Sequence, residues 1–369
     1  MTHRAKNRNR VEYSSQDRMF MKIALSLSER AKGFTEPNPL VGAVAVKKGR
    51  ILGTGYHHFF GGAHAERIAL TGIRETGTTL FVTLEPCAHF GKTPPCVDWL
   101  IRKNVARVVV AIPDPNPLVC GRGIQRLRER GIQVQVGLFQ EEAGRINRHY
   151  LKFMIHNRPY VTIKAGISLD GKMSDKQRRS QWVTSSLQRQ VAHSLRGEFS
   201  AILAGRRTIM EDDPQLTVRE RAWSGKKLFR VVLDSRNQLS VTHKIFRDQA
   251  RFPLIIFSSE RAANKEKKTA RHFFIEEDAF GLDLDQALQI LARQGIASVL
   301  VEGGGQVIDS FLSQNLFDEA ILFTAAKFLG GKEAVELFSC GVDGLAKAIA
   351  ITRVEITPVT DGFILRGFK

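Results

Sequence analysis

The stretch from His64 to Cys96 constrains the chain more than any other part of the sequence. It contains three short motifs, His64-Ala65-Glu66, Glu85-Pro86-Cys87 and Pro94-Pro95-Cys96. One imidazole and two thiolates can supply three ligands to a tetrahedral zinc ion, and a catalytic zinc keeps its fourth position open for water. The fold must therefore bring together a histidine and two cysteines that are well separated along the chain.

Glu66 gives this set of ligands a chemical purpose. It lies two residues after a candidate ligand, on the first turn of a predicted helix, so its carboxylate can reach a metal-bound water without being a ligand itself. Zinc lowers the pKa of its water to about 7, and the resulting hydroxide can attack an amidine-type ring carbon while Glu66 carries protons to the departing amine. The pattern predicts a hydrolytic deaminase.

Simpler interpretations exist for each residue taken singly. A His-x-Glu triplet is common by chance, and a lone intracellular cysteine is usually a small buried apolar residue. A structural zinc would need a fourth ligand, for which His89 is available, but Glu66 would then have no role. A non-catalytic, zinc-stabilised binding protein is the corresponding hypothesis for function. The complete set of residue types, in this order, favours a catalytic site.

Length and composition predict two domains and no membrane. The chain has 369 residues, 43% of them apolar, which suffices for two hydrophobic cores. A linker at residues 155–159 predicts domains over residues 1–155 and 156–369, and residues 1–13 are polar, basic and predicted to be disordered. No run approaches the roughly 18 apolar residues of a membrane span, and the first residues lack an apolar signal core. Four cysteines give no disulfide framework, so we expect a cytoplasmic protein.

The net charge of +18 raises the question of a nucleic-acid partner. An RNA- or tRNA-acting zinc deaminase with an appended nucleotide-binding domain is the alternative hypothesis that such a charge suggests. The basic residues are dispersed in small clusters along the chain, which is more typical of a solvated surface. We therefore expect no specific nucleic acid, and a surface charge that attracts a phosphorylated substrate and a dinucleotide.

The first half reads as an α/β layered domain. Ser14 or Ser15 caps a predicted helix that carries Met19, Ile23 and Leu27 at four-residue spacing and ends near Gly33. A hairpin is predicted over residues 41–56, with further strands at 79–83, 107–112 and 132–136 and a last helix over 141–154. A second helix is expected to begin near Cys87, so that both ligand groups lie at helix N-termini, which favour thiolates.

The second half contains one candidate phosphate-binding turn. Residues 160–164 and 298–301 are predicted strands. Glu302-Gly303-Gly304-Gly305 follows the second strand and precedes a helix predicted over 306–312, whose backbone N–H groups can cradle a phosphate. A tight connection without any ligand explains the glycines equally well.

These motifs resemble known families. His64-Ala65-Glu66 with Pro86-Cys87 and a second cysteine is similar to the cytidine-deaminase superfamily, although that superfamily usually has Pro-Cys-x-x-Cys and here the cysteines are nine positions apart. The insert over residues 83–96, together with Asp114-Pro115-Asn116-Pro117, resembles the deaminase half of the bifunctional deaminase/reductase family of riboflavin biosynthesis. The second half resembles the reductase half through the segments 168–172, 180–184, 212–219, 233–235 and 302–304.

The resemblance implies a fold class and cofactors. It implies an α/β protein with an N-terminal cytidine-deaminase-like three-layer α/β/α domain and a C-terminal α/β domain similar to dihydrofolate reductase. Zn²⁺ would serve the first domain and NADPH the second. The implied substrate is 2,5-diamino-6-(5-phosphoribosylamino)pyrimidin-4(3H)-one, which would be deaminated and then reduced from ribosyl to ribityl to give 5-amino-6-(5-phosphoribitylamino)uracil. We also expect a homo-oligomer.

The resemblance also implies site residues. In the first domain these are the metal ligands His64, Cys87 and Cys96 and the catalytic Glu66. NADP contacts are implied at Gly166, Trp182, Thr208, Asp212, Ser235, Gly304 and Gly305. Substrate contacts are implied at Asn38, Ser180, Arg196, Leu216, Arg219 and Glu302.

Several of these residues have a structural interpretation as well. Asn38 is as well explained as a turn former, Trp182 as core, Asp212 as a turn cap, and Arg196 and Arg219 as surface charges. An arginine nevertheless suits a ribose phosphate because its planar fork binds oxyanions bidentately. The sequence departs from the family at three positions: Arg178 replaces a frequent glycine, and Ala63 and Ala326 each replace a proline.

Overall fold

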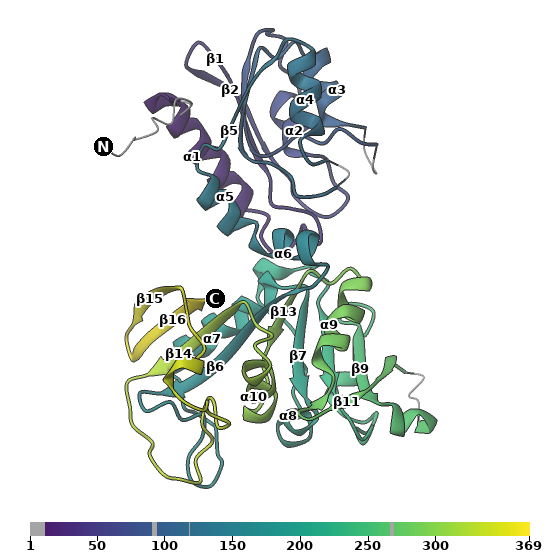
Figure 1. Ribbon diagram of the computed structural model, residues 1–369, viewed down its shortest axis with the longest axis vertical. Helices are drawn as coiled ribbons and strands as arrows, with labels where there is room; N and C mark the ends of the chain where they lie inside the picture. The colour runs from purple at the N-terminus through teal and green to yellow at the C-terminus, as the bar shows by residue number, and fades with distance from the viewer. Residues whose placement is uncertain (1–11, 91–93, 118, 266–268) are drawn as a thin grey trace, which may run out of the picture. The chain divides into compact units, whose positions relative to one another are not determined.

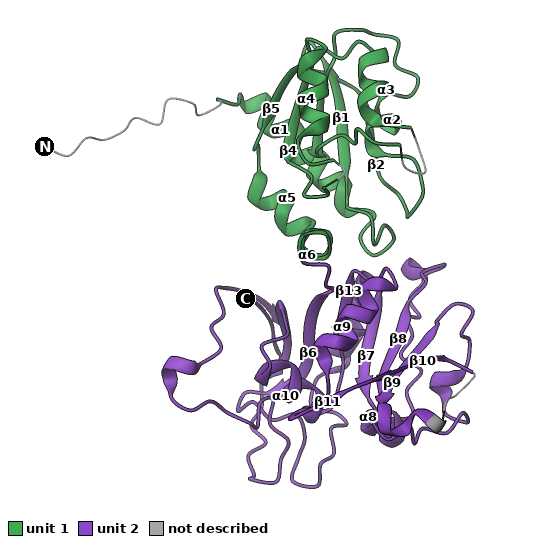
Figure 2. Ribbon diagram, turned by 45° about the vertical axis from the view of Figure 1, so that its right-hand side comes forward, with its two compact units in different colours: residues 1–155 green, residues 156–369 purple. Residues whose placement is uncertain are grey.

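The computed structural model describes residues 12–90, 94–117, 119–265 and 269–369. The chain divides into two compact units, Met1–Ile155 and His156–Lys369, which are described separately (Figure 2). The disorder predicted for residues 1–13 falls mostly outside the described residues. For Tyr13 the prediction is wrong, because its hydroxyl donates a hydrogen bond to the Val136 carbonyl at 2.8 Å.

The first unit has a five-stranded sheet in the order β2-β1-β3-β4-β5. Strand β1 is antiparallel to β2 and β3, whereas β3, β4 and β5 run parallel. The strands are β1 (Gly42–Lys47), β2 (Arg50–Tyr56), β3 (Thr79–Leu84), β4 (Arg107–Ile112) and β5 (Gln133–Val136). The predicted hairpin and strands are therefore confirmed.

Helices cover both faces of this sheet (Figure 1). Alternate residues of β1 point to opposite faces, so Ala43 and Ala45 join one core and Val44 and Val46 another. The first core packs under α2 (Ala65–Leu70), α3 (Cys96–Arg102) and α4 (Arg122–Glu129), and the second under α1 (Ser15–Glu29), α5 (Gln140–Ile146) and α6 (Arg148–His156). This is the predicted three-layer α/β/α arrangement.

Helix α1 starts as predicted, and two of its three predicted apolar positions, Ile23 and Leu27, pack on the second core. The Ser14 hydroxyl accepts a hydrogen bond from the Asp17 amide, and the Asp17 carboxylate accepts one from the Ser14 amide, forming a capping box. The third apolar position, Met19, is 48% exposed. The reason is the close approach of α1 to β1, where a side chain on Gly42 would lie 1.9 Å from the Ala24 carbonyl oxygen, so the helix presents its Ala24 side to the sheet.

The helix predicted over residues 141–154 is two helices, α5 and α6, separated at Asn147. The Asn147 side chain accepts a hydrogen bond from the Leu40 amide at 2.8 Å and donates one to the Leu40 carbonyl at 3.0 Å. Asparagine side chains that bond to a distant backbone in this way compete with helix continuation. The break therefore ties the last helices of the unit to the loop that contains Asn38.

The second unit is built on a nine-stranded sheet in the order β10-β9-β8-β7-β13-β6-β14-β16-β15. The strands from β10 to β14 in this order are parallel, and β16 and β15 are antiparallel additions at one edge. The strands are β6 (Tyr160–Ser168), β7 (Ala201–Gly205), β8 (Phe229–Leu233), β9 (Leu254–Ser259), β10 (Arg271–Ile275), β13 (Ser298–Val301), β14 (Glu319–Ala325), β15 (Arg353–Val359) and β16 (Gly362–Phe368). Two short strands, β11 (Glu277–Asp278) and β12 (Gly281–Leu282), form a separate ribbon.

Helices again lie on both faces. Helices α9 (Leu284–Arg293) and α10 (Gly305–Ser313) pack on one face of the sheet over a large hydrophobic core. Helices α7 (Ser186–Leu195) and α8 (Arg206–Asp212) pack on the opposite face. Short 3₁₀ turns complete the unit at Arg196–Glu198, Arg221–Trp223, Lys244–Phe246, Glu260–Lys265 and Leu345–Lys347. In a parallel sheet of this kind, ligands bind where the strands' carboxyl ends meet. Among the described residues, no helix has the length and apolar character needed to cross a membrane.

The seating of α2 on the sheet yields a first prediction. A side chain on Gly55 would lie 2.4 Å from the Ala65 carbonyl oxygen, so Gly55→Val should displace α2. We expect the free energy of unfolding to fall by about 1–3 kcal/mol, as for other overpacked sites, and metal binding to weaken because His64 precedes this helix. Thermal unfolding and metal content measure both effects. Thr54→Val, at the exposed neighbouring position, is the control, and equal behaviour of the two variants would contradict the prediction.

Candidate active sites

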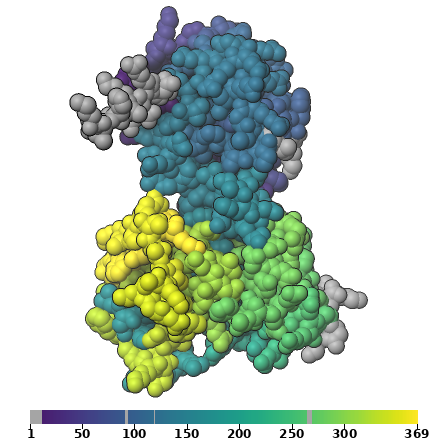
Figure 3. Space-filling model, viewed as in Figure 1, coloured from purple at the N-terminus to yellow at the C-terminus, as the bar shows by residue number. Residues whose placement is uncertain are grey.

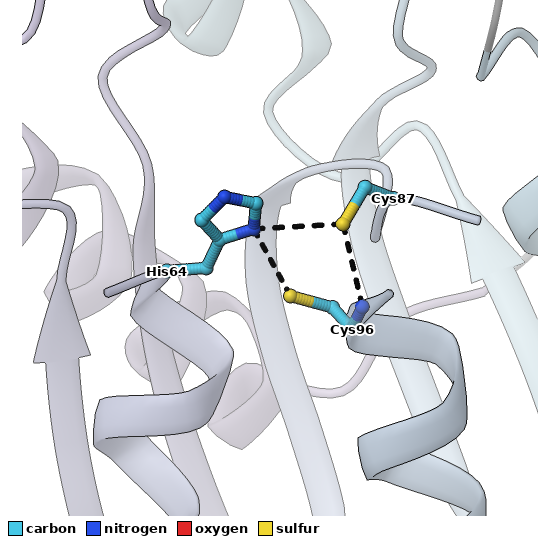
Figure 4. A group of neighbouring side chains, drawn as sticks. All are labelled: His64, Cys87 and Cys96. Atoms are coloured by element: carbon cyan, nitrogen blue, oxygen red, sulfur yellow. Dashed lines mark hydrogen bonds between the residues drawn. The ribbon is translucent and has the colours of Figure 1, made fainter. Parts of the chain in front are cut away.

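His64, Cys87 and Cys96 converge on one point in the first unit (Figure 4). His64 is the N-cap of α2, Cys96 is the first residue of α3, and Cys87 lies in the loop after β3. The His64 Nδ1 atom lies 3.1 Å from the Cys96 Sγ atom and 3.5 Å from the Cys87 Sγ atom. A tetrahedral zinc with bond lengths of about 2.0 Å to nitrogen and 2.3 Å to sulfur sets its donors roughly 3.5–3.8 Å apart. The three donor atoms therefore fit a zinc ion with small adjustments.

The second helix of the site begins at Cys96, and the prediction that it begins near Cys87 is wrong. The predicted effect is nevertheless present, because the Cys96 amide at the start of α3 donates a hydrogen bond to the Cys87 sulfur at 3.3 Å. Among the described residues, the group placed to hold a metal does not include His89. The alternative of a four-ligand structural site through His89 has no support in this geometry.

The two cysteines differ in their acidity. A hydrogen bond from the Cys96 side chain, helped by His64 and by the Cys96 amide, lowers the pKa of Cys87 to about 4 against the effect of burial. The same shared hydrogen bond and burial raise the pKa of Cys96. The site therefore stabilises a thiolate at Cys87 through its own backbone and side chains, as metal ligation requires.

Glu66 lies on the first turn of α2 and is only 3% exposed. Burial raises the pKa of its carboxyl group, while His64 and a hydrogen bond with Cys96 oppose the change. The carboxyl group is thus beside the metal ligands without being one of the grouped donors. A carboxyl group with a raised pKa is suited to taking up and releasing protons near neutral pH.

A cavity of about 330 Å³ opens over these residues. Asn38 and His57 lie in its wall, and their side chains are hydrogen-bonded at 3.1 Å. The His57 Nδ1 atom faces the Ala63 carbonyl at 3.0 Å and must donate to it, and burial lowers the pKa of His57, so its Nε2 atom accepts from the Asn38 amide group. Asn38 lies in a turn, as one interpretation expected, and also lines the cavity, as the other expected.

Sequence reasoning missed other residues of this wall. His57 and Tyr150 carried no recognisable signal, and Asp114 was noticed only as part of a motif. The Tyr150 hydroxyl donates to the Asp114 carboxylate at 2.7 Å, and both side chains are buried. Burial raises the pKa of Asp114. These contacts join segments more than thirty residues apart, so only the folded structure brings them together.

In the second unit, the predicted NADP contacts collect at the carboxyl ends of adjacent parallel strands. Gly166 lies near the end of β6, Thr208 follows β7, Ser235 follows β8 and Gly304 follows β13. The Gly304 amide donates a hydrogen bond to the Thr208 hydroxyl at 3.1 Å. Gly304 is the N-cap of α10 and has no side chain to cap the helix, so N–H groups of the first turn can bind a phosphate.

The glycine turn leaves little room for side chains. A Cβ atom on Gly303 would lie 2.7 Å from Val307, and one on Gly305 would lie 2.8 Å from Val335. Glycine at these two positions therefore allows the turn to pack closely against Val307 and Val335.

Trp182 and Asp212 are both at the surface of this unit. Trp182 is 63% exposed, with the Arg189 guanidinium 4.1 Å from its ring centre, so the interpretation of Trp182 as core is wrong. Asp212 is the last residue of α8 and is exposed. Ser180 is exposed in the loop before α7. In the same loop Arg178 has a φ of 61°, a left-handed conformation that glycine adopts more readily than arginine.

Arg196 and Glu302 form an ion pair instead of standing apart. The Arg196 Nε and Nη2 atoms donate to the two Glu302 carboxylate oxygens at 2.7 and 2.9 Å. Lys164, which sequence reasoning missed, donates to the same carboxylate at 3.5 Å. Burial raises the pKa of Glu302, but the charges of Arg196 and Lys164 outweigh it and lower the pKa to about 2. The Arg196 side chain is only 12% exposed, so its interpretation as a surface charge is wrong, and its fork is occupied by Glu302.

The remaining predicted substrate contacts separate into two kinds. The Leu216 side chain is buried in a core cluster, so any contact with a ligand must come from its backbone. Arg219 is exposed, and its guanidinium donates to the Gln215 side chain at 3.3 Å. Within the described part of the chain Arg219 has no ion pair, so its guanidinium can bind an anionic group.

Comparison with known proteins decides the family. Residues 14–112 match the model of the cytidine and deoxycytidylate deaminase zinc-binding region, and residues 159–365 match that of the RibD C-terminal domain. The riboflavin biosynthesis protein RibD of Aquifex aeolicus is 39% identical over 95% of this chain and 97% of its own length. That of Escherichia coli is 40% identical over 93% and 97%. The chain belongs to the RibD family.

Solved RibD structures agree with this assignment. The Thermotoga maritima deaminase/reductase has a TM-score of 0.85 at 34% identity and covers 96% of this chain and 98% of its own. Acinetobacter baumannii RibD has the same TM-score at 35% identity, with the same coverage.

Membership of the RibD family confirms the function predicted from the motifs. The chain is a bifunctional deaminase and reductase of riboflavin biosynthesis, with zinc and NADPH as cofactors. The fold class is confirmed as a deaminase-like α/β/α domain followed by a reductase domain with a fold similar to dihydrofolate reductase. The RNA-acting alternative and the non-catalytic binding protein are both wrong.

The Glu302 ion pair predicts a response to acid. Because the pKa of Glu302 is about 2 in the folded chain and about 4.3 in an unfolded one, the pair contributes fully above about pH 5 and is lost as the pH falls towards 2. At pH 7, Glu302→Gln should lower the free energy of unfolding by about 3–5 kcal/mol, since Arg196 loses its buried counter-charge. The loss of stability between pH 5 and pH 3 should also become shallower. Urea unfolding at several pH values measures both effects.

The control is Glu211→Gln, which removes an exposed ion pair with Arg207 and should change stability by less than about 1 kcal/mol. A Glu302→Gln variant as stable as this control at pH 7 would contradict the assignment.

Proposed function

We propose that the chain deaminates 2,5-diamino-6-(5-phosphoribosylamino)pyrimidin-4(3H)-one and then reduces the ribosyl group of the product to give 5-amino-6-(5-phosphoribitylamino)uracil. The Thermotoga maritima protein is described as a diaminohydroxyphosphoribosylaminopyrimidine deaminase and 5-amino-6-(5-phosphoribosylamino)uracil reductase, which supports this choice of substrates. The observation that carries the first activity is the meeting of His64, Cys87 and Cys96 beside the buried Glu66 at one cavity.

In the first site, we assign the metal to His64, Cys87 and Cys96, whose donor spacing suits it. Zinc, when bound, supplies a Lewis acid that activates water at neutral pH. Glu66 accepts the proton of the attacking water and delivers it to the departing amine, so that one water is consumed and one ammonia is released. Asn38 uses its amide N–H on His57, which leaves its carbonyl oxygen to accept a hydrogen bond from the pyrimidine.

In the second site, the backbone at Gly304 and Gly305 binds a cofactor phosphate at the start of α10. The Thr208 hydroxyl holds this turn through the Gly304 amide, and Gly166 and Ser235 line the neighbouring strand ends. Trp182 and Asp212 are assigned to the same cofactor. NADPH, when bound, supplies the hydride.

We assign the substrate of the second site to the region around Glu302, at the carboxyl end of β13. Ser180, Arg219 and the backbone of Leu216 contact the phosphoribosyl group, with the exposed Arg219 as the donor for its phosphate. The Arg196–Glu302 pair presents a fixed, neutralised polar surface to the sugar, and Lys164 is the one ammonium group recorded on that carboxylate within the described part of the chain. The protein's contribution to this step is orientation.

We further assign the chain to the cytoplasm and to a homo-oligomer. Its four cysteines are free thiols, and two of them are the proposed ligands, which a reducing compartment preserves. The C-terminal hairpin lies at the surface of the second unit (Figure 3), where edge strand β15 exposes Val354 (51%) and Ile356 (61%). Exposed apolar edges of this kind are sites of association. The mass of the purified chain in solution tests the oligomer.

Replacement of Glu66 tests the first activity. Glu66→Ala, or the isosteric Glu66→Gln, should reduce ammonia release by a factor of about 100 or more because the proton carrier is lost. Zinc content and NADPH oxidation on already deaminated substrate should both be retained, since neither uses this carboxylate. Glu75→Gln, at an exposed position of the same unit, is the control. A Glu66 variant that deaminates normally would defeat the assignment.

Replacement of Arg219 tests the second site. Arg219→Ala should raise the KM of the phosphorylated substrate about tenfold, as expected for one charged hydrogen bond, while the KM of NADPH changes much less. Initial-rate measurements with each reactant varied in turn give both constants. The nearby exposed Arg221→Ala should leave both unchanged. Equal increases in the two constants would show that Arg219 does not contact the substrate.

A further inference from the structure

The first site contains a second buried glutamate, Glu85, whose carboxylate has a different environment from that of Glu66. Glu85 follows β3 and is 3% exposed. Its Oε1 atom accepts hydrogen bonds from the Gly123 and Ile124 amides at 2.9 and 3.1 Å. Its Oε2 atom accepts from the Asp114 and Gly121 amides at 3.2 and 3.0 Å.

These four bonds use the lone pairs of both oxygens. Glu85 therefore has no capacity left for a metal ion or for proton transfer, although it lies only two residues before Cys87. Its partners are all backbone N–H groups, and three of them belong to the start of α4, a helix that no side chain of its own caps. The first N–H groups of a helix have no partner within the helix, and here the Glu85 carboxylate accepts their hydrogen bonds and lies at the positive end of the helix dipole.

The bonds join two segments that both form the first site. On one side, the Glu85 amide donates to the Ile112 carbonyl at 3.0 Å, and the chain continues to Cys87. On the other side, Asp114, Asn116 and Val119 line the cavity wall that leads into α4. One carboxylate thus ties the loop that carries a metal ligand to the wall that faces the substrate.

The contact between the ligand loop and α4 is so close that it restricts the residue at position 123. A Cβ atom on Gly123 would lie 2.1 Å from the Pro86 carbonyl oxygen and 3.1 Å from the Glu85 Oε1 atom. Beyond Cys87, the Cys87 carbonyl accepts a hydrogen bond from the Val97 amide on α3 at 3.2 Å. The ligand loop is therefore held at α4 through Glu85 and at α3 through Val97.

We propose that Glu85 is a positioning residue of the zinc site, which sets Cys87 and the cavity wall at Asp114, Asn116 and Val119 relative to each other. This inference rests on the proposed zinc chemistry of the first site. A positioning role differs from a general stabilising role because loss of Glu85 would then change both metal binding and substrate binding.

The test is Glu85→Gln in the full chain. The amide keeps the size of the side chain but turns one acceptor oxygen into an NH₂ group that faces two N–H donors. We expect zinc to be released to a chromogenic chelator about tenfold faster or more, as when other groups that orient metal ligands are changed. The visible spectrum of the Co²⁺-substituted protein should also change, and the KM for deamination should rise along with a fall in kcat. NADPH oxidation on deaminated substrate should stay normal and reports a folded chain.

Two further variants keep the test decisive. Glu85→Asp retains the charge but withdraws the carboxylate by one methylene, so it should show the same changes to a smaller degree. It replaces Glu85→Gln in the test if that variant does not fold. Glu129→Gln, on the exposed end of α4, is the control and should match the wild type.

The outcomes separate the two proposals. A wild-type chain that binds no zinc would refute the proposed zinc chemistry. A zinc-loaded wild type, with folded Glu85 variants that match its zinc release and Co²⁺ spectrum, would refute the positioning role alone.

Discussion

The parallel pairing of β3 with β4 is the interaction on which the first site depends. Leu84 lies opposite Ile112 at the ends of these strands, and the ladder extends one step further through the Glu85 amide. Because parallel strands end at the same edge of a sheet, the chain leaves both strands side by side. One exit leads to a cysteine ligand and the other to the cavity wall. Without this register, residues of suitable chemistry would be present but not within reach of one another.

In the second unit the proposed site also lies at the carboxyl ends of parallel strands, but its central carboxylate is paired in a different way. Glu302 follows β13, which lies between β7 and β6, so ligands from several strand ends meet around it. A buried carboxylate is costly unless it is paired, and here Arg196 and Lys164 both compensate its charge. The two units therefore each place a buried glutamate at a strand end, one satisfied by backbone N–H groups and the other by side-chain cations.

Much of the fold could be predicted where the signal is local. The capping box at Ser14, the hairpin turn at Lys48 and Gly49, both with positive φ, and the strand-glycine-helix unit around Gly304 each depend on a few neighbouring residues. The exposure of Met19 on α1 could not be predicted, because the contact of the helix with Gly42 decides which side meets the sheet. The break at Asn147 depends on Leu40, more than a hundred residues away.

The sites follow the same division. The ligand types and Glu66 could be predicted because zinc hydrolysis requires those groups, whatever the fold. The bonding of Asn38 to His57, the ion pair between Arg196 and Glu302, and the four partners of Glu85 could not, since each joins residues that no spacing rule connects. Several strands of the second sheet carried too little periodic signal to be assigned, and their order results from crossovers that only the folded chain reveals.

The hydrogen bond from Tyr13 to Val136 has a consequence for how copies of the chain can meet. Strand β5 ends its sheet and is only four residues long, and the tyrosine occupies a carbonyl that a foreign strand would otherwise use. Short, partly blocked borders resist unwanted strand addition. Strand β15 has seven residues and ends the other sheet, and no side chain of the described residues blocks it in this way. The deaminase half is thus shielded from sheet-to-sheet growth at β5, whereas the reductase half leaves a longer border to which a neighbour can add.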